Sequence, residues 1–116
     1  MPRDRHDKDD FFKALTALEG VLSDNAERSR LIKKRIELLR RSRGNGTSFS
    51  ELVEGEDGPL IVNLLTESSA ELDTCGAAVR RAEARALYAE GMTMEQIAES
   101  FGVTRQRVSA LLRKSP

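Results

Sequence analysis

The chain has 116 residues, which suits one domain or two small ones. Its composition, with 33% charged and 4% aromatic residues, excludes a large globular core in a single copy of the chain. The formal net charge is zero but unevenly distributed: Lys and Arg number 12 against 8 Asp and Glu in residues 1–43, none against 7 in residues 44–79, and 7 against 4 in residues 80–116. Two basic ends around an acidic middle are compatible with binding of a polyanion at the ends.

A long helix is predicted from Asp9 or Asp10 to about Ser42. Acidic residues crowd its first turn and basic residues its last, which stabilises the helix dipole. Asn25 and Ser29 interrupt its apolar seam: they either fix the register of pairing in a dimer or mark a place where the helix bends away or faces water. The predicted inward positions recur in steps of four and three and so form a heptad repeat, which is typical of a helix that packs against another helix. They are Phe11, Leu15, Leu18, Leu22, Asn25, Ser29, Ile32, Ile36 and Leu39.

Residues 43–58 contain four glycines and predict a loop. Within it, SFSELV suits a short helical turn that Phe49 and Leu52 hold against the core. A basic cluster precedes the loop, and we interpret it as a solvated face with charges that favour a helix C-terminus; the alternative is a second phosphate-binding surface or a surface for the acidic middle of a partner chain. The cluster consists of Lys33, Lys34, Arg35, Arg40, Arg41 and Arg43.

A second helix is predicted from Pro59 to about Glu90, with Gly91 ending it and Gly76 as a weak point for a kink. Two long helices joined by a loop predict an antiparallel hairpin. Apolar residues off both seams leave such a hairpin underpacked alone, so we expect a homodimer; they are Val21, Leu31, Leu38 and Leu60. The predicted inward positions of the second helix are Ile61, Leu65, Ser68, Leu72, Cys75, Val79, Ala82 and Ala86.

Residues 94–113, MEQIAESFGVTRQRVSALLR, have the spacing of a helix-turn-helix. A first short helix places Ile97, Ala98 and Phe101 on one face. Gly102 follows at once and predicts a left-handed turn, because glycine adopts positive φ without strain. The chain therefore stops, turns and restarts within about four residues.

Capping residues precede both short helices. Thr93, with Gln96 three residues on, has the spacing of a capping box, and Thr104 suits the N-cap of the second helix. After Val103 leads in, Val108 and Leu111 fall at helical spacing and pack back on the first helix. The remaining face is rich in hydrogen-bond donors and free of carboxylates, as suits a helix that enters the major groove of DNA. It carries Arg105, Gln106, Ser109 and Arg113, with Arg107 beside it.

The segment FGVTRQRVSALL resembles the helix-turn-helix of bacterial transcription regulators. It is most similar to the promoter-reading region of primary sigma factors and to the small domains of resolvase-type recombinases. The resemblance covers residues 80–113, about a third of the chain, with Arg81–Glu90 as the support helix, and implies a second helix that docks in the major groove. Neither a second promoter-reading region nor a resolvase catalytic domain is found in residues 1–79. By position, Thr104 would contact phosphate, Arg105, Gln106 and Ser109 would reach base edges, and Arg113 would reach bases or backbone.

Other classes of protein lack their signatures. Cys75 is the one cysteine and His6 the one histidine, so neither a disulfide nor a His and Cys metal site is expected. We interpret Cys75 as a small buried hydrophobe, with a redox switch as the less favoured alternative. No pattern of an enzyme, a bound cofactor, a signal peptide or a membrane span is present, and the GNG at residues 44–46 lacks the lysine of a phosphate loop.

We therefore expect an all-α chain with a dimerising helical hairpin over residues 1–79 and a helix-turn-helix DNA-binding domain over residues 80–116. Its expected function is sequence-specific binding of double-stranded DNA in the cytoplasm, at the nucleoid, as a dimeric transcription regulator or nucleoid-associated factor. The alternative is an interaction protein that binds RNA polymerase, a sigma factor or another regulator. The seven carboxylates from Glu51 to Asp73 motivate it, because without a cation they attract a basic partner.

Overall fold

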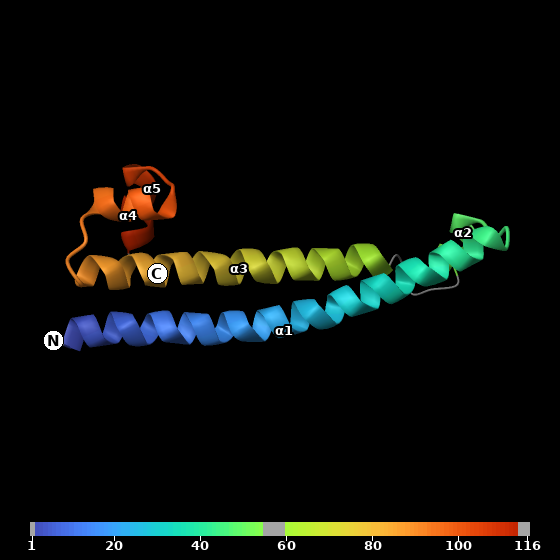
Figure 1. Ribbon diagram of the computed structural model, residues 1–116, viewed down its shortest axis with the longest axis horizontal. Helices are drawn as coiled ribbons and strands as arrows, with labels where there is room; N and C mark the ends of the chain where they lie inside the picture. The colour runs from blue at the N-terminus through green and yellow to red at the C-terminus, as the bar shows by residue number, and fades with distance from the viewer. Residues whose placement is uncertain (1, 55–59, 114–116) are drawn as a thin grey trace. The chain divides into compact units, whose positions relative to one another are not determined.

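The computed structural model describes residues 2–54 and 60–113, with side chains from residue 6 onward. This part of the chain is all-α, as expected, and none of its helices is apolar over a stretch long enough to span a membrane. The helices are α1 (Pro2–Gly44), α2 (Phe49–Glu54), α3 (Leu60–Ala89), α4 (Met94–Phe101) and α5 (Arg105–Leu112) (Figure 1).

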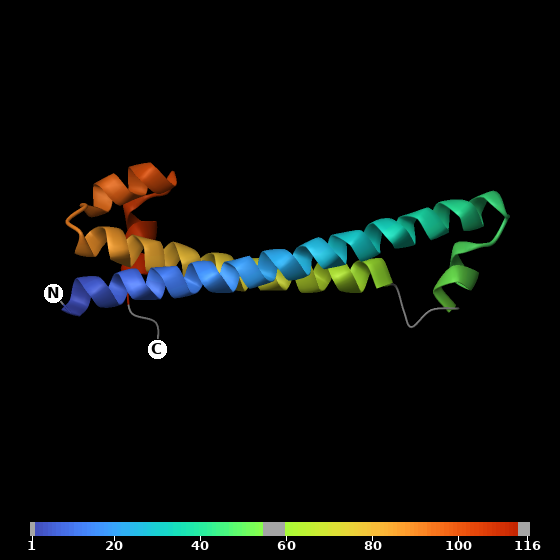
Figure 2. The ribbon, with the colours of Figure 1, turned by 60° about the horizontal axis from the view of Figure 1, so that its bottom comes forward.

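The chain divides into two compact units. The terminal unit comprises Met1–Glu19 with Thr74–Pro116, and the central unit comprises Gly20–Asp73. In each unit a stretch of α1 runs beside an antiparallel stretch of α3 (Figures 1 and 2). An ion pair of 3.1 Å between Lys8 Nζ and Glu90 Oε2 joins the two chain segments of the terminal unit.

The helix α1 begins earlier than the sequence pattern indicates, at Pro2 instead of Asp9 or Asp10. A helix accommodates proline in its first turn because the amide hydrogen that proline lacks has no partner there. Arg41 and Arg43 lie in the last turn, as the dipole argument predicts. Gly46 then adopts a φ of 80°, and the Thr47 amide donates to the Ser42 carbonyl at 3.1 Å, which closes the helix end.

The short helix in the loop is confirmed as α2, but one of its two expected anchors is wrong. Ser48 accepts a hydrogen bond from the Glu51 amide at 3.2 Å and so caps α2. Leu52 is half-buried, whereas Phe49 is 65% exposed because it lies on the solvent side of this short helix. Pro59, the predicted start of the next helix, lies outside the described residues, and α3 begins at Leu60.

Seven of the nine predicted seam positions of α1 are inward, and the other two are wrong by one residue. Leu22 and Ser29, expected to be inward, are exposed, and Leu22 is exposed by 52%. Val21 and Arg28, one residue earlier, are half-buried in their place. Periodicity alone does not separate two adjacent stripes when one of them is more apolar than the true seam. The confirmed inward positions are Phe11, Leu15, Leu18, Asn25, Ile32, Ile36 and Leu39.

The same shift occurs in α3. Leu65 and Leu72 are exposed by 52% and 40%, while Leu64 is buried and Glu71 is half-buried. The helix continues through Gly76, so the expected weak point does not interrupt it. Cys75 is 8% exposed, in agreement with its interpretation as a small buried hydrophobe. The other predicted inward positions are buried or half-buried: Ile61, Ser68, Val79, Ala82 and Ala86.

A polar layer lies between α1 and α3 in the central unit. The guanidinium of Arg28 donates from Nη1 to Glu71 Oε1 at 3.2 Å and from Nη2 to Glu71 Oε2 at 2.7 Å, which is a bidentate pair. Nη1 also donates to Asn25 Oδ1 at 3.0 Å, and Nε lies 3.4 Å from Glu67 Oε2. The hydrogen bond to Glu71 raises the pKa of Arg28, although partial burial opposes this shift. Asn25 therefore joins a hydrogen-bonded layer within the helix pair.

Breaking the Arg28–Glu71 pair on one side is expected to cost more stability than removing the whole pair. Arg28 retains only 13% exposure of its side chain, so Arg28→Leu leaves the Glu71 carboxylate without its cation, and Glu71→Leu leaves the guanidinium without its anion. Both single variants should melt at lower temperature, measured by circular dichroism. The double variant Arg28→Leu/Glu71→Leu should melt above either single variant.

The matched control is Arg30→Leu. Arg30 pairs with Glu27 at 2.6 Å, but both side chains are more than half exposed, so its loss should leave the melting temperature nearly unchanged. A double variant that melts below both single variants would show that the polar layer contributes net stability, contrary to this expectation.

Candidate nucleic-acid interface

A small apolar core joins the end of α3 to α4 and α5. Ala84, Ile97 and Val108 are fully buried, one from each helix. Ala98 and Leu111 complete the core at 7% and 5% exposure, so the expected packing of the two short helices is confirmed. The C-terminal part of α3 supplies the support helix that was predicted from Arg81 to Glu90. Partly buried side chains pack around this core: Leu87, Met92, Met94, Phe101 and Leu112.

The turn between α4 and α5 has the predicted glycine geometry. Gly102 adopts a φ of 68°, in the left-handed region, and the Val103 amide donates to the Ala98 carbonyl at 3.0 Å. This pairing satisfies a carbonyl at the end of α4. An added Cβ at Gly102 would meet no atom within 4 Å, so backbone conformation and not space favours glycine there.

Both short helices begin at the predicted caps. The Thr93 hydroxyl accepts from the Gln96 amide at 3.1 Å, while the Gln96 side chain accepts from the Thr93 amide at 2.9 Å, which is a complete capping box. The Thr104 hydroxyl accepts from the Arg107 amide at 3.1 Å. Because that hydroxyl oxygen is the acceptor, its own hydrogen stays available to a phosphate oxygen beside the start of α5.

The first turn of α5 presents its polar side chains to solvent. Arg105, Gln106 and Arg107 are all exposed, while the next residue, Val108, anchors the helix in the core. Four donor-bearing side chains, with Thr104 included, therefore project from one helix N-terminus. In helix-turn-helix proteins, residues at this end of the second helix contact base edges.

The last two predicted site residues are placed differently from the first four. Ser109 is half-buried one turn further along α5. Arg113 is the C-cap of α5: its amide still donates to the Ser109 carbonyl at 3.2 Å, and its φ of −65° and ψ of 136° turn the chain out of the helix after it. The Arg113 carbonyl accepts a hydrogen bond from Arg85 Nη2 at 2.9 Å, which ties the end of α5 to α3.

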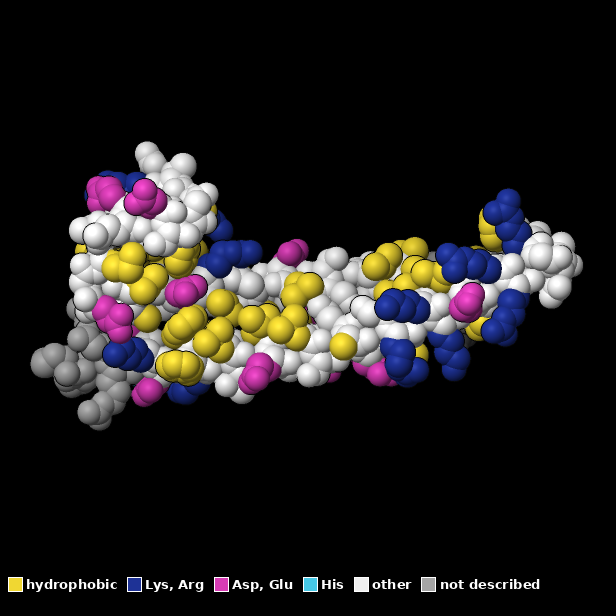
Figure 3. Space-filling view, in the orientation of Figure 1, with side chains coloured by type: hydrophobic (Ala, Val, Ile, Leu, Met, Phe, Trp, Pro, Cys, Tyr) yellow, Lys and Arg dark blue, Asp and Glu magenta, His cyan; other side chains and the backbone are white. Residues whose placement is uncertain are grey.

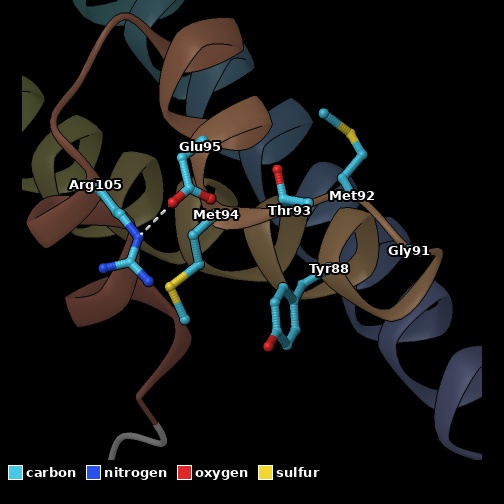
Figure 4. A pocket seen from close by; sticks show the side chains of 7 residues that line it. All are labelled: Tyr88, Gly91, Met92, Thr93, Met94, Glu95 and Arg105. Carbon is cyan, nitrogen blue, oxygen red and sulfur yellow. Dashed lines mark ion pairs between the residues drawn. The ribbon is translucent and has the colours of Figure 1, made fainter.

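An ion pair that the sequence reading missed connects the two short helices. Arg105 Nε lies 2.9 Å from Glu95 Oε2, and both side chains are largely exposed, by 62% and 69% (Figure 4). From the sequence alone, Glu95 supplies only a favourable negative charge in the first turn of α4. Helical periodicity does not relate Glu95 to Arg105, because a turn separates the two helices that carry them. The pair forms only because α4 and α5 cross. Glu95 and Arg105 line a shallow hollow with Tyr88, Gly91, Met92, Thr93 and Met94.

The comparisons with known proteins point to the same segment. Residues 84–115 match the family model described as Sigma-70, region 4. A search of curated proteins and a search of solved structures each found no match. The matched range begins at the buried Ala84 and includes α4 and α5, so it coincides with the small core and its exposed helix. The match suggests a DNA-binding module that acts at promoter-like sites.

Gly102→Ala is expected to lower the free energy of unfolding by about 1 kcal/mol or slightly more, because alanine resists a positive φ. Urea denaturation followed by circular dichroism measures it. The matched control is Gly20→Ala, since Gly20 lies within α1, also with nothing within 4 Å of an added Cβ. That change should instead raise the free energy by about 1 kcal/mol. Equal effects at both glycines would contradict the explanation by backbone conformation.

Proposed function

Because residues 84–115 match the sigma-70 region 4 family and fold as a helix-turn-helix, we propose that the protein is a sequence-specific DNA-binding protein that regulates transcription at promoter-like sites. The observation that carries the proposal is that the first turn of α5 is exposed while Val108 of the same helix is fully buried in the core. A regulator of this kind works at the nucleoid. If the protein binds all duplexes equally, a nucleoid-associated role replaces the regulatory one.

In the proposed complex, α5 enters the major groove with its N-terminal end toward the bases. Arg105 and Gln106 reach base edges, where arginine recognises guanine and glutamine recognises adenine through paired hydrogen bonds. The hydroxyl of Thr104 and the guanidinium of Arg107 bind phosphates beside the groove, and Ser109 lies close enough to the groove floor for one polar contact. Because Arg113 lies at the C-terminal end of α5, farthest from the end that faces the bases, we assign it to the DNA backbone.

We further propose that the protein acts as a homodimer. The eight residues of α5 offer few base contacts, whereas a two-fold dimer reads two half-sites together. The domain division expected from the sequence, with residues 1–79 for dimerisation and 80–116 for DNA binding, is kept as part of this proposal.

A leucine stripe on the central unit supports the dimer. It consists of Leu22 from α1 with Leu65 and Leu72 from α3, each directly following a seam residue. In an antiparallel pair, equivalent flanking positions of the two helices lie on the same side, so the three leucines share one face. A helix pair with apolar seam and flank is typical of a bundle that packs on further helices. Figure 3 shows hydrophobic side chains exposed at the surface.

The alternative of an interaction protein with an acidic surface has less support. Glu67 and Glu71, two of the seven carboxylates from Glu51 to Asp73, already pair with Arg28 of the same chain. An external basic partner is therefore not needed to balance them. In the basic cluster, Arg40 lies 3.9 Å from Glu37, which favours the interpretation of a solvated helix end.

Arg105→Ala and Gln106→Ala should each weaken binding to the best DNA site by roughly 1 to 3 kcal/mol and relax selectivity at one base pair. The best site is first selected from random duplexes with the purified full chain, and binding is then measured by fluorescence anisotropy. Lys13→Ala on α1 is the control for loss of an exposed positive charge. An unchanged affinity in the double variant Arg105→Ala/Gln106→Ala would refute α5 as the reading helix, and failure of the unaltered chain to bind any duplex at low salt would favour the interaction protein.

Leu22→Lys, Leu65→Lys and Leu72→Lys should each shift the chain toward monomer in sedimentation equilibrium, because each places a charge in the proposed dimer contact. Val62→Lys is the matched control, since Val62 of α3 is 56% exposed but lies outside the leucine stripe. The helical content should stay unchanged in all four variants. A monomeric unaltered chain, or equal effects of all four substitutions, would contradict the proposed interface.

A further inference from the structure

The Glu95–Arg105 ion pair engages one particular nitrogen of the arginine. The pair joins Nε of Arg105 to Oε2 of Glu95 at 2.9 Å. The terminal nitrogens Nη1 and Nη2 point away from the carboxylate (Figure 4). Glu95 lies in the first turn of α4 and Arg105 is the first residue of α5, so the pair spans the helix crossing.

This geometry matters for how an arginine reads a base. A guanidinium recognises guanine through two parallel N–H donors, aimed together at O6 and N7. An exposed arginine has many rotamers, and a contact that holds it in one of them reduces the entropy lost on binding. A carboxylate on Nε restrains the side chain while leaving both terminal nitrogens to the base.

We propose that Glu95 is a specificity-determining positioning residue, which holds Arg105 through Nε so that its terminal nitrogens demand guanine at one position of the site. This inference rests on the proposed DNA-reading role of α5. It adds to that role a residue of α4 that need not touch DNA.

Glu95 is expected to have opposite effects on affinity and on selectivity. Its carboxylate repels the phosphates of any duplex, so its charge lowers binding to all sequences alike. Its hold on Arg105 favours one base at one position only. A residue that merely stabilised the fold would change binding to every sequence in the same direction and would leave the ratio between sequences constant.

The test compares Glu95→Gln with unaltered protein on two duplexes, the selected best site and the same site with the base pair read by Arg105 replaced. Glu95→Gln should bind random duplex more tightly, while its preference for the best site over the replaced site falls by about two- to fivefold, the range of exposed charge pairs. Glu99→Gln is the matched control, because Glu99 is an exposed carboxylate of the same helix for which no ion pair is found among the described residues. It should leave the preference unchanged.

A double-mutant cycle separates this inference from the function on which it rests. In the Arg105→Ala background, Glu95→Gln should no longer change the preference, because there is no guanidinium to hold. A change that persists in this background would show that Glu95 contacts DNA itself and would overturn the proposal. An unchanged preference in Glu95→Gln, with Arg105→Ala still losing selectivity, would also overturn it while leaving α5 as the reading helix. Loss of the proposed function would instead appear as no sequence preference in the unaltered chain.

Discussion

The burial of Ile97 and Val108 against Ala84 is the contact on which the candidate interface depends. Each of these residues has 0% exposure, and each comes from a different helix. The small side chain of Ala84 lets α4 and α5 approach α3 closely, and the two larger residues fill the space between them. With Val108 fixed in the core, Gln106 is directed to the opposite side of the helix, and Arg105 is left on an exposed flank beside it. An apolar contact therefore directs the polar face, although it makes no contact with a ligand.

The helix pair of the central unit follows a different principle, since its seam mixes apolar and charged residues. Ile32 and Leu64 are inward in the expected manner, but Arg28 and Glu71 occupy seam positions between the apolar ones. A bidentate ion pair in a seam adds little net stability because both charges lose water. It does limit how the two helices align, since only one register brings this guanidinium to its carboxylate. The leucines that follow seam residues, although more apolar than Arg28 and Glu71, lie outside the seam on its flank: Leu22, Leu65 and Leu72.

The sequence predicted the helix-turn-helix in detail because its signals are local. Gly102, Thr93 and Thr104 act on neighbouring backbone atoms within a few residues, and all three adopt the geometry that their chemistry favours. The seams were harder, since hydrophobicity ranks Leu22 above Arg28 while only the partner helix decides which faces inward. The Glu95–Arg105 pair was beyond prediction, because it exists only once two helices cross. The caps and the turn, which depend on neighbouring residues, could thus be predicted from the sequence. The seam positions and the ion pair, which depend on packing between helices, could not.

The helix α3 contributes residues to both units, and its part in the terminal unit has one more property. Within the terminal unit, Cys75 is buried beside the helix pair and Ala84 is buried beneath the helix-turn-helix, and continuous helix joins them. A helix turns by about 100° per residue, so the number of residues between these two positions acts as an angular setting. One inserted residue would rotate α4 and α5 by about 100° around α3, whereas a seven-residue insertion, close to two full turns, would nearly restore their direction. The length of this helix is therefore under the same constraint as the identity of its side chains.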